Sequence, residues 1–368
     1  AKKCADIIMK SLAKMQPNKE YEGIAQGPFT YRKEKECYDP KVENLNEEMV
    51  DILKQAIDHT KKRVKRSSGT FEKTSAESYL LSSNNGEARE KATGLYFSIR
   101  SFVDNESSGY GSCVSRMKNK LKITEATEHA TNIAQLSKAP KKTISGSLDV
   151  IFAPHAIAAI MERFADNASI FSVESGLSCL KNQLGKKIAS EQVTLYDDPT
   201  RTNSYGSTAF DAEGTPTQRT SIIEKGFLKN YLHNASTAKR YKTKSTGNAG
   251  LISPRAFAPS LKPGSYTKEE LFKGIKKGIY ITNVWYTRFQ NHETGDFSTI
   301  PRDGAFYIEN GKIKYPLKDI RISENMLKLM QNISALGKEA IEIKSWEVET
   351  PTTVPYTVIK NVNITKPN

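Results

Sequence analysis

The feature that most constrains the fold is a hairpin signal near residue 310. Asn310-Gly311 stands between the apolar segments Phe306-Tyr307-Ile308 and Ile313. Both turn residues accept the positive φ that a two-residue hairpin turn requires. Upstream, the residues from Tyr280 onward alternate as in a strand. The run 280–312 therefore predicts strands that hold a polar loop rigidly between them.

That polar loop is the first candidate for chemistry or recognition. Its charged and amide side chains, with the aromatic residues before them, could line a substrate chamber or a subunit interface. The candidates are Trp285, Tyr286, Arg288, Asn291, His292, Asp296, Arg302 and Asp303. The alternative is a network of arginine and aspartate side chains that pair with one another and pin the loop, because buried polar groups are normally paired.

Several separated blocks resemble the TldD/PmbA family, also called the modulator of DNA gyrase family. The resemblance rests on VWYTRFQNHETGDFS at 284–298 and PRDGAFYIENGKI at 301–313. Further blocks follow the family's order at 188–199, 210–217, 223–228 and 245–249, and more loosely at 84–86 and 148–154. Agreement of several separated blocks is a stronger signal than any one of them.

The resemblance implies a two-domain protein of an intracellular peptidase system that acts on unfolded or modified peptides. One member type, TldD-like, is similar to a zinc metallopeptidase and carries an HExxxH helix and a late cysteine. The PmbA or TldE type lacks those ligands, and the two types pair as a heterodimer. The older family name reflects a link to DNA gyrase control.

The helix expected at 155–171, HAIAAIMERFADNASIF, decides between the two types. A zinc-peptidase helix presents two histidines on one face with a glutamate that activates water. Glu162 and Arg163 stand where the first histidine and the glutamate would be, and Asp166 or Asn167 stands where the second histidine would be. We therefore expect no cofactor in this chain and zinc in the partner subunit.

The cysteines point the same way. Cys4, Cys37, Cys113 and Cys179 are dispersed, and none lies in the C-terminal segment, so no paired-cysteine metal site is predicted. Glu162 and Asp166 leave one alternative open, because residues four apart share a helix face and two carboxylates can bind a hard cation. The competing interpretation is an ordinary solvated or salt-bridged helix face.

Length and composition set the outer bounds. A chain of 368 residues is long for one core, so two domains are expected. We predict an α+β protein, with an N-terminal α/β domain at 1–142 and a mostly β, barrel-like C-terminal domain with helical decorations at 143–368.

No apolar run is long enough for a membrane span, and no signal peptide is recognised. These features, with few cysteines, favour a cytoplasmic location. Family members usually begin further upstream, so N-terminal residues are expected to be missing.

Local patterns refine this outline. Helices are predicted at 46–66 with Asn46 as its cap, at 123–136, from the capping box at Thr267, and at 323–337. Short strands are predicted at 77–83, 93–103 and 109–116, and a final strand pair is predicted within 346–365.

The net charge is +14, with basic clusters at 61–66, 118–122 and 138–142. Such charge attracts polyanions, but nucleic-acid binding usually also shows stacking aromatic residues or a recognised module. A solvated basic face is therefore favoured over a nucleic-acid site.

The resulting prediction is a TldE/PmbA-like subunit without its own zinc, paired with a TldD-like homologue or homodimeric in its absence, around a chamber for peptide. Arg288 or Arg302 would meet peptide carboxylates or carbonyls. The alternatives are a stand-alone peptidase with an atypical metal site and a basic regulator linked to nucleic acid or gyrase.

Overall fold

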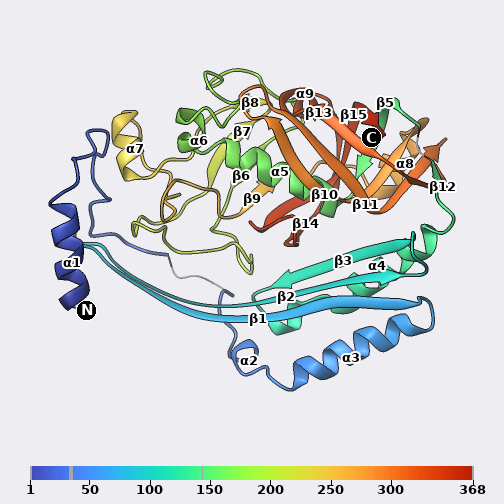
Figure 1. Ribbon diagram of the computed structural model, residues 1–368, viewed down its shortest axis with the longest axis horizontal. Helices are drawn as coiled ribbons and strands as arrows, with labels where there is room; N and C mark the ends of the chain where they lie inside the picture. The colour runs from blue at the N-terminus through green and yellow to red at the C-terminus, as the bar shows by residue number, and fades with distance from the viewer. Residues whose placement is uncertain (1, 33–35, 143, 367–368) are drawn as a thin grey trace.

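The computed structural model describes residues 2–32, 36–142 and 144–366, and it is an α+β protein built around two sheets. In Figure 1 the smaller sheet lies along one side of the molecule and the larger, mostly β part lies above it. The helices are α1 (Lys2–Leu12), α2 (Pro40–Glu43), α3 (Glu48–Lys61), α4 (Ile123–Leu136), α5 (Pro154–Asn167), α6 (Ile170–Glu174), α7 (Ala235–Arg240), α8 (Lys268–Lys273) and α9 (Met326–Gln331), with a 3-10 turn at Lys118–Lys120.

The strands follow in two groups. The N-terminal sheet contains β1 (Arg66–Leu81), β2 (Glu87–Phe102) and β3 (Ser108–Ser115). The large sheet contains β4 (Lys141–Lys142), β5 (Gly146–Phe152), β6 (Leu195–Asp197), β7 (Thr220–Glu224), β8 (Phe227–Leu228), β9 (Pro259–Leu261), β10 (Lys277–Asn291), β11 (Asp296–Glu309), β12 (Lys312–Lys318), β13 (Arg321–Asn325), β14 (Ile333–Ile343) and β15 (Thr352–Thr365).

The N-terminal sheet is an antiparallel meander covered on one face by α3 and α4. Phe97 and Ile99 of β2 pack with Ala56 of α3 and Ala126 of α4 in one buried cluster. Helix α4 lies close to β3, because a Cβ added at Gly111 would come within 2.1 Å of the Ala126 carbonyl oxygen. This close approach fixes α4 against the sheet edge that faces the larger part of the molecule.

The large sheet closes on itself in part. Strand β5 pairs with β10 and β15, β10 pairs with β11, and β13 pairs with both β11 and β15. These pairings form a closed ring of strands, which confirms the barrel-like character that the resemblance implied.

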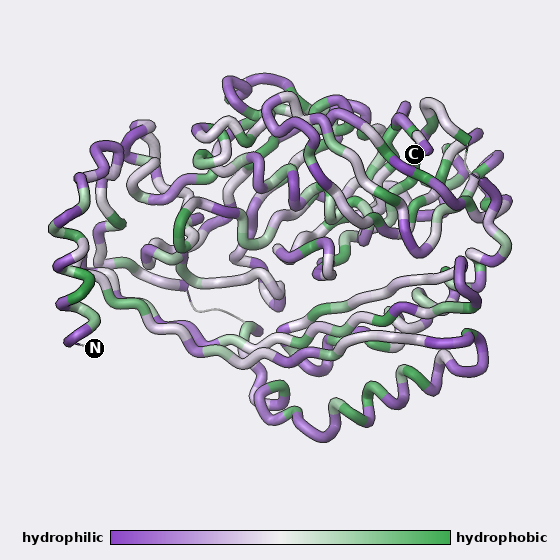
Figure 2. Tube along the Cα trace, in the orientation of Figure 1, coloured by the Kyte–Doolittle hydropathy of each residue, from purple (hydrophilic) through white to green (hydrophobic). Residues whose placement is uncertain are grey.

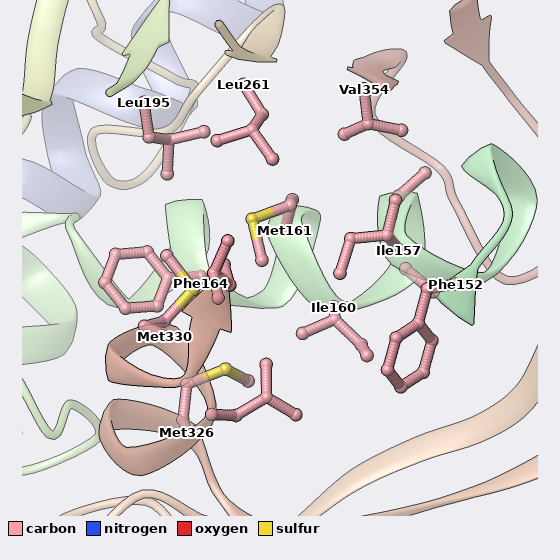
Figure 3. Close-up of a cluster of buried hydrophobic side chains, with 14 of the residues drawn as sticks. Phe152, Ile157, Ile160, Met161, Phe164, Leu195, Leu261, Met326, Met330 and Val354 are labelled. Carbon is pink, nitrogen blue, oxygen red and sulfur yellow. The ribbon is translucent and has the colours of Figure 1, made fainter. Parts of the chain in front are cut away.

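Helix α5 is the central buried element of the larger part. Its apolar residues Ile157, Ile160, Met161 and Phe164 are fully buried. Figure 3 shows them between Leu195, Leu261 and Val354 on one side and Met326 and Met330 on the other. A helix packed at interior density has little freedom to move, so the polar side chains on α5 are held in fixed positions.

Two sequence expectations near the C-terminus are wrong. The helix predicted at 323–337 is limited to α9, because Arg321–Asn325 and Ile333–Ile343 are drawn into strand pairing with β11 and β15. The strand pair predicted within 346–365 is the single strand β15, whose antiparallel partner is β14.

In the N-terminal part, the structure changes the residue bounds of the predicted helix and of two predicted strands. Helix α3 ends at Lys61 rather than at 66, and Asn46 does not cap it; its side-chain oxygen accepts a hydrogen bond from Lys73 Nζ at 2.8 Å. The strands predicted at 77–83 and 93–103 are longer, because β1 and β2 pair without interruption from Arg66–Phe102 to Leu81–Glu87. The strand predicted at 109–116 is confirmed as β3. The prediction of helix 123–136 and the capping box at Thr267 are confirmed.

Helix α1 stands apart from both sheets at the far end of the β1–β2 hairpin (Figure 1). Figure 2 shows hydrophobic and hydrophilic residues alternating along it, and none of its residues is buried. Among the described helices, none combines the length and apolarity that crossing a membrane requires.

Candidate functional site

The run 280–312 is a strand hairpin rather than a rigid pair of strands around a long polar loop. Strands β10 and β11 pair from Lys277–Glu309 to Asn291–Asp296, so only residues 292–295 form the turn. Register shifts near Trp285 and Phe289 accommodate the polar residues within the pairing, as β-bulges do. The Asn310-Gly311 turn is confirmed, with φ of 49° and 74°.

Three of the predicted site residues build the tip of this hairpin. The Asn291 side-chain oxygen accepts hydrogen bonds from the backbone N–H groups of Glu293 and Thr294, at 2.9 and 3.1 Å. His292 packs on Phe289 with ring centroids 4.8 Å apart. Asp296 accepts from Asn325 Nδ2 at 3.0 Å, and this contact leads the causes that lower its pKa. These contacts give Asn291, His292 and Asp296 a local structural role.

Asp303 joins the two sheets. Its side chain is fully buried and accepts hydrogen bonds from Arg100 Nε of β2, Ser108 Oγ of β3 and Asn283 Nδ2 of β10. Removing one partner of such a buried ion pair leaves the other charge buried without a partner, which destabilises the fold. The network of paired arginine and aspartate that the sequence left as an alternative therefore exists at Asp303, but its arginine comes from the N-terminal sheet.

The aromatic patch consists of Trp285, Tyr286 and Trp346. The Trp346 ring lies 5.2 Å from that of Trp285 and 5.6 Å from that of Tyr286, centroid to centroid. Tyr286 is 47% exposed and Trp346 is 58% exposed. Tyr286 also has φ of +57°, a strained conformation for a bulky residue that concentrates at functional sites. Strain and aromatic exposure together make the patch a candidate for recognition.

Two arginines stack on the patch. The guanidinium carbons of Arg100 and Arg302 lie 4.8 and 4.9 Å from the Trp285 ring centroid. Arg100 is committed to Asp303, whereas exposed Arg302 has no hydrogen-bond or ion-pair partner within the described part of the chain. Arg288 is paired instead, with its Nη1 atom 3.1 Å from Glu347 Oε1. Of the two arginines predicted to meet substrate, Arg302 is therefore the one with its donors free.

Segment 344–351 connects this patch to helix α5. Trp346 belongs to the patch, and Glu347 accepts hydrogen bonds from Thr287 N at 2.6 Å and from Arg288. Three residues later, the backbone N–H of Thr350 donates to Glu162 Oε1 at 2.6 Å. One short segment thus contacts the signature hairpin at one end and α5 at the other.

The α5 face carries Glu162, Arg163 and Asp166. Glu162 is only 3% exposed, its Oε2 atom has no partner among the described residues, and burial raises its pKa to about 7. Arg163 Nη1 lies 3.6 Å from Asp166 Oδ2. The sequence favoured a solvated or salt-bridged face, and the salt bridge is found between the half-buried Arg163 and Asp166. Burial raises the pKa of Asp166 to about 6. Glu162 instead turns into the protein.

These residues do not fit a zinc ion. Zinc in peptidases takes imidazole, thiolate or ionised carboxylate ligands, whereas a guanidinium occupies position 163 and the buried carboxyl of Glu162 is tied to Thr350. Across 2–32, 36–142 and 144–366, no three His, Cys, Asp or Glu side chains come together in a way that could hold a metal ion.

A cleft of about 1110 Å³ opens between the hairpin β1–β2 and the larger part. Glu90 and Arg116 line it from below, and Arg255, Glu349 and Thr350 from above. Segment 344–351 thus borders the cleft as well as the patch.

The rim of the cleft carries two bare aliphatic side chains. Leu251 and Ile252 are 97% and 87% exposed, so two adjacent aliphatic side chains face solvent at the edge of the cleft. Sequence reasoning missed them, although an aliphatic pair between Gly250 and Ser253-Pro254 was a visible signal.

Comparison with known proteins assigns the family. Residues 145–366 match the family model described as the PmbA/TldA metallopeptidase C-terminal domain. The chain belongs to the PmbA/TldD metallopeptidase family. The match covers β5 to β15, so it includes α5, the aromatic patch and segment 344–351.

Relatives of this PmbA/TldD family protein agree with that assignment. The metalloprotease TldD homolog of Buchnera aphidicola subsp. Acyrthosiphon pisum is 30% identical over 227 residues, which are 60% of this chain and 47% of that protein. The chain spans about half the length of the curated metalloproteases that it matches first.

Two solved structures share the fold. A Thermotoga maritima protein described as a candidate modulator of a DNA gyrase superposes with a TM-score of 0.88 and 26% identity, over 97% of this chain and 82% of that one. TldE from Thermococcus kodakarensis gives a TM-score of 0.87 and 22% identity, over 96% and 82% of the two chains.

Proposed function

We propose that this family member is the subunit without a metal site in a PmbA/TldD-type metallopeptidase complex of the cytoplasm. It pairs with a metal-bearing homologue and supplies part of the chamber that holds unfolded or modified peptides. The observation that carries the proposal is the α5 face: a guanidinium at Arg163 and a buried, hydrogen-bonded carboxyl at Glu162 stand where zinc ligands would be needed.

The substrate role is supported by the surfaces beside α5. The cleft is bordered by charged groups of both signs and by the bare Leu251 and Ile252. An extended peptide offers backbone carbonyls, carboxylates and apolar side chains, which match free guanidinium donors, aromatic rings and aliphatic rims. In this proposal Arg302 contacts the peptide, and the aromatic patch contacts either the peptide or the partner subunit.

The basic clusters favour this function over nucleic-acid binding. Lys61 pairs with Asp58, Arg63 with Glu128, Lys118 with Glu48, Lys120 with Glu36 and Lys122 with Glu125. Each of these five pairs reduces the positive charge that a polyanion would meet, which favours a solvated face for the clusters at 61–66 and 118–122.

Metal content and peptidase activity test the proposal. We expect the purified chain to contain substoichiometric zinc and to cleave no peptide alone. Mixed with a metal-bearing homologue from the same source, it should form a complex whose cleavage of unfolded peptide stops with a chelator. Stoichiometric zinc in the isolated chain, or chelator-sensitive cleavage by it alone, would instead establish a stand-alone peptidase.

Arg302 gives a sharper prediction within that complex. Arg302→Ala should lower kcat/KM for peptide cleavage about tenfold, the effect of losing a hydrogen bond to a charged group, without changing thermal stability. The matched control is Arg219→Ala, since Arg219 is also exposed and stacks on an aromatic ring, Tyr196, at 3.9 Å. Equal kcat/KM values for the two variants would show that Arg302 does not contact the peptide.

A further inference from the structure

Strand β1 forms a long open edge of the N-terminal sheet. The strand order is β1-β2-β3, and β3 is the strand that lies nearest the larger part of the molecule (Figure 1). None of the 16 residues of β1 is buried. Free edges are usually blunted by proline, by bulges or by a covering segment, whereas β1 contains no proline and pairs with β2 without a register shift. Such an edge is a template for pairing with another strand.

Alternate backbone groups of β1 face away from β2. The N–H of Ser82 donates to the Gly86 carbonyl at 2.8 Å, so in the antiparallel register the even-numbered residues of β1 bond to β2. The N–H of Thr93 on β2 agrees with this alternation, because it donates away from β1 to the Cys37 carbonyl. The odd-numbered residues 67–81 therefore direct their N–H and C=O groups outward, and no other backbone group within the described residues pairs with them.

Helix α3 lies over β1 on one face of the sheet. Thr60 Oγ1 of the helix is 2.9 Å from Ser67 Oγ of the strand, and Phe71 packs against the buried cluster that contains Ala56. Successive side chains of a strand alternate between the two faces. The odd-numbered side chains of β1 therefore stand on the same face as α3.

The side of α3 that lies away from α4 carries exposed apolar residues. Val50 and Ile57 are both exposed, and they lie two helical turns apart, so they share one side of the helix. His59 contacts Glu128 of α4. Because Ile57 is two positions earlier in a helix of 3.6 residues per turn, it lies nearly opposite His59. Val50 and Ile57 therefore face outward past the edge of β1.

Two further apolar side chains are exposed toward the other end of β1. Tyr79 and Leu81 are 65% and 82% exposed, and as odd-numbered residues they stand on the same face of the sheet as α3. Tyr79 lies eight residues beyond Phe71, about 26 Å along the strand at about 3.3 Å per residue. Within one copy of the chain, these side chains are too far along the strand to cover the exposed side of α3.

The outward-facing positions of β1 are self-complementary about Ser75. Antiparallel pairing of two β1 strands with Ser75 opposite Ser75 places Lys73 opposite Glu77. The same register places Phe71 opposite Tyr79. Opposite charges and aromatic side chains that face each other directly stabilise an antiparallel pair. Each of these pairs occurs twice, because a two-fold contact uses the same surface on both copies.

We propose that β1 is a pairing edge for a second copy of this chain, so that two β1 strands join antiparallel about Ser75 into one continuous six-stranded sheet. Leu81 of each copy then lies opposite Gly69 of the other, whose missing side chain leaves room for it. Tyr79 and Leu81 of each copy cover the exposed side of α3 in the other. The pairing does not depend on the proposed peptidase role.

Sedimentation of the full chain over a range of concentrations tests this pairing, and we expect a species with twice the mass of one chain. Ser75→Pro should weaken the association at least about tenfold, because it removes both central outward N–H donors. Its fold should persist, since proline is tolerated on an edge strand where the N–H faces solvent. Ser75→Ala is the matched control: it also loses the hydroxyl that lies 3.2 Å from Glu43 Oε1, but it keeps the N–H and should associate like the wild type.

Charge reversal tests the register and the identity of the partner. Lys73→Glu and Glu77→Lys each place like charges opposite one another twice, so each variant alone should associate about tenfold more weakly. An equimolar mixture of the two variants restores every opposite-charge pair and should regain the wild-type affinity. A chain that stays monomeric at all concentrations, or that associates only with a metal-bearing homologue, would overturn the proposal. So would equal association of Ser75→Pro and Ser75→Ala, or a mixture of the charge-reversed variants that gains no affinity.

Discussion

At pH 8, Glu162→Gln is expected to be about 3 kcal/mol more stable than the wild-type chain. Burial raises the pKa of Glu162 from 4.5 to about 7, and each tenfold change in the proton affinity of a group corresponds to about 1.4 kcal/mol. The unfolded chain releases this proton near pH 4.5, whereas the folded chain holds it until about pH 7. Wild-type stability is therefore lost as pH rises between those values, and a neutral glutamine escapes that loss.

Denaturant unfolding of both chains at pH 4.5 and pH 8 measures this difference. The two should be nearly equal at pH 4.5, because the carboxyl is then protonated in the folded state. Glu324→Gln is the matched control: Glu324 is also buried, but its oxygens accept from Asn325 N and Asn363 N, and Lys328 lies 3.2 Å away. That variant should lose stability at pH 8. A Glu162→Gln chain that is no more stable than wild type at pH 8 would show that Glu162 is ionised without cost.

Acid should weaken the contact between the two sheets through the histidine pair. The surrounding protein lowers the pKa of His129 to about 4 and that of His155 to about 3. In the unfolded chain both rings gain a proton near pH 6.5. Stability is thus full above pH 6.5 and is lost as pH falls toward 4, by about 2 kcal/mol per ring between pH 7 and pH 5.

A comparison of variants isolates this effect from other titrating groups. His129→Phe keeps a ring stacked on His155 but cannot bind a proton, so acidification from pH 7 to pH 5 should cost it about 2 kcal/mol less than it costs the wild type. Tyr110→Phe is the control, because that ring packs on the same histidine at 5.6 Å and should change stability equally at both pH values. If the stability of the wild type and of His129→Phe depended on pH in the same way, protonation of His129 would not be the cause of the acid sensitivity.

The sequence predicted those features of the fold that depend on residues close together in the chain. The Asn310-Gly311 turn, the helix at 123–136 and the Thr267 capping box depend on residues a few positions apart. The helix predicted at 323–337 failed because β11 and β15, distant in sequence, recruit its two ends as strands. Tertiary pairing overrides helical spacing in such cases.

The candidate site was predictable only in part for the same reason. Trp285, Tyr286 and Arg302 were recognised from their own segment, but Trp346 reaches them from beyond β14 and Arg100 from the N-terminal sheet. The burial of Glu162 depends on Thr350, a contact that no spacing along α5 reveals. Residues that act together across 60 to 200 positions could be placed only by the folded chain.

Segment 344–351 has a thermodynamic consequence for any assembly that this chain forms. The same eight residues present Trp346 to the outside, border the cleft and fasten to α5. If a molecule in the cleft and a partner at Trp346 each favour one position of the segment, binding of either alters the affinity for the other. By linkage, the docked partner alters the affinity for that molecule by the same factor. The affinity for substrate and the affinity for the partner subunit would then be coupled without direct contact between the two.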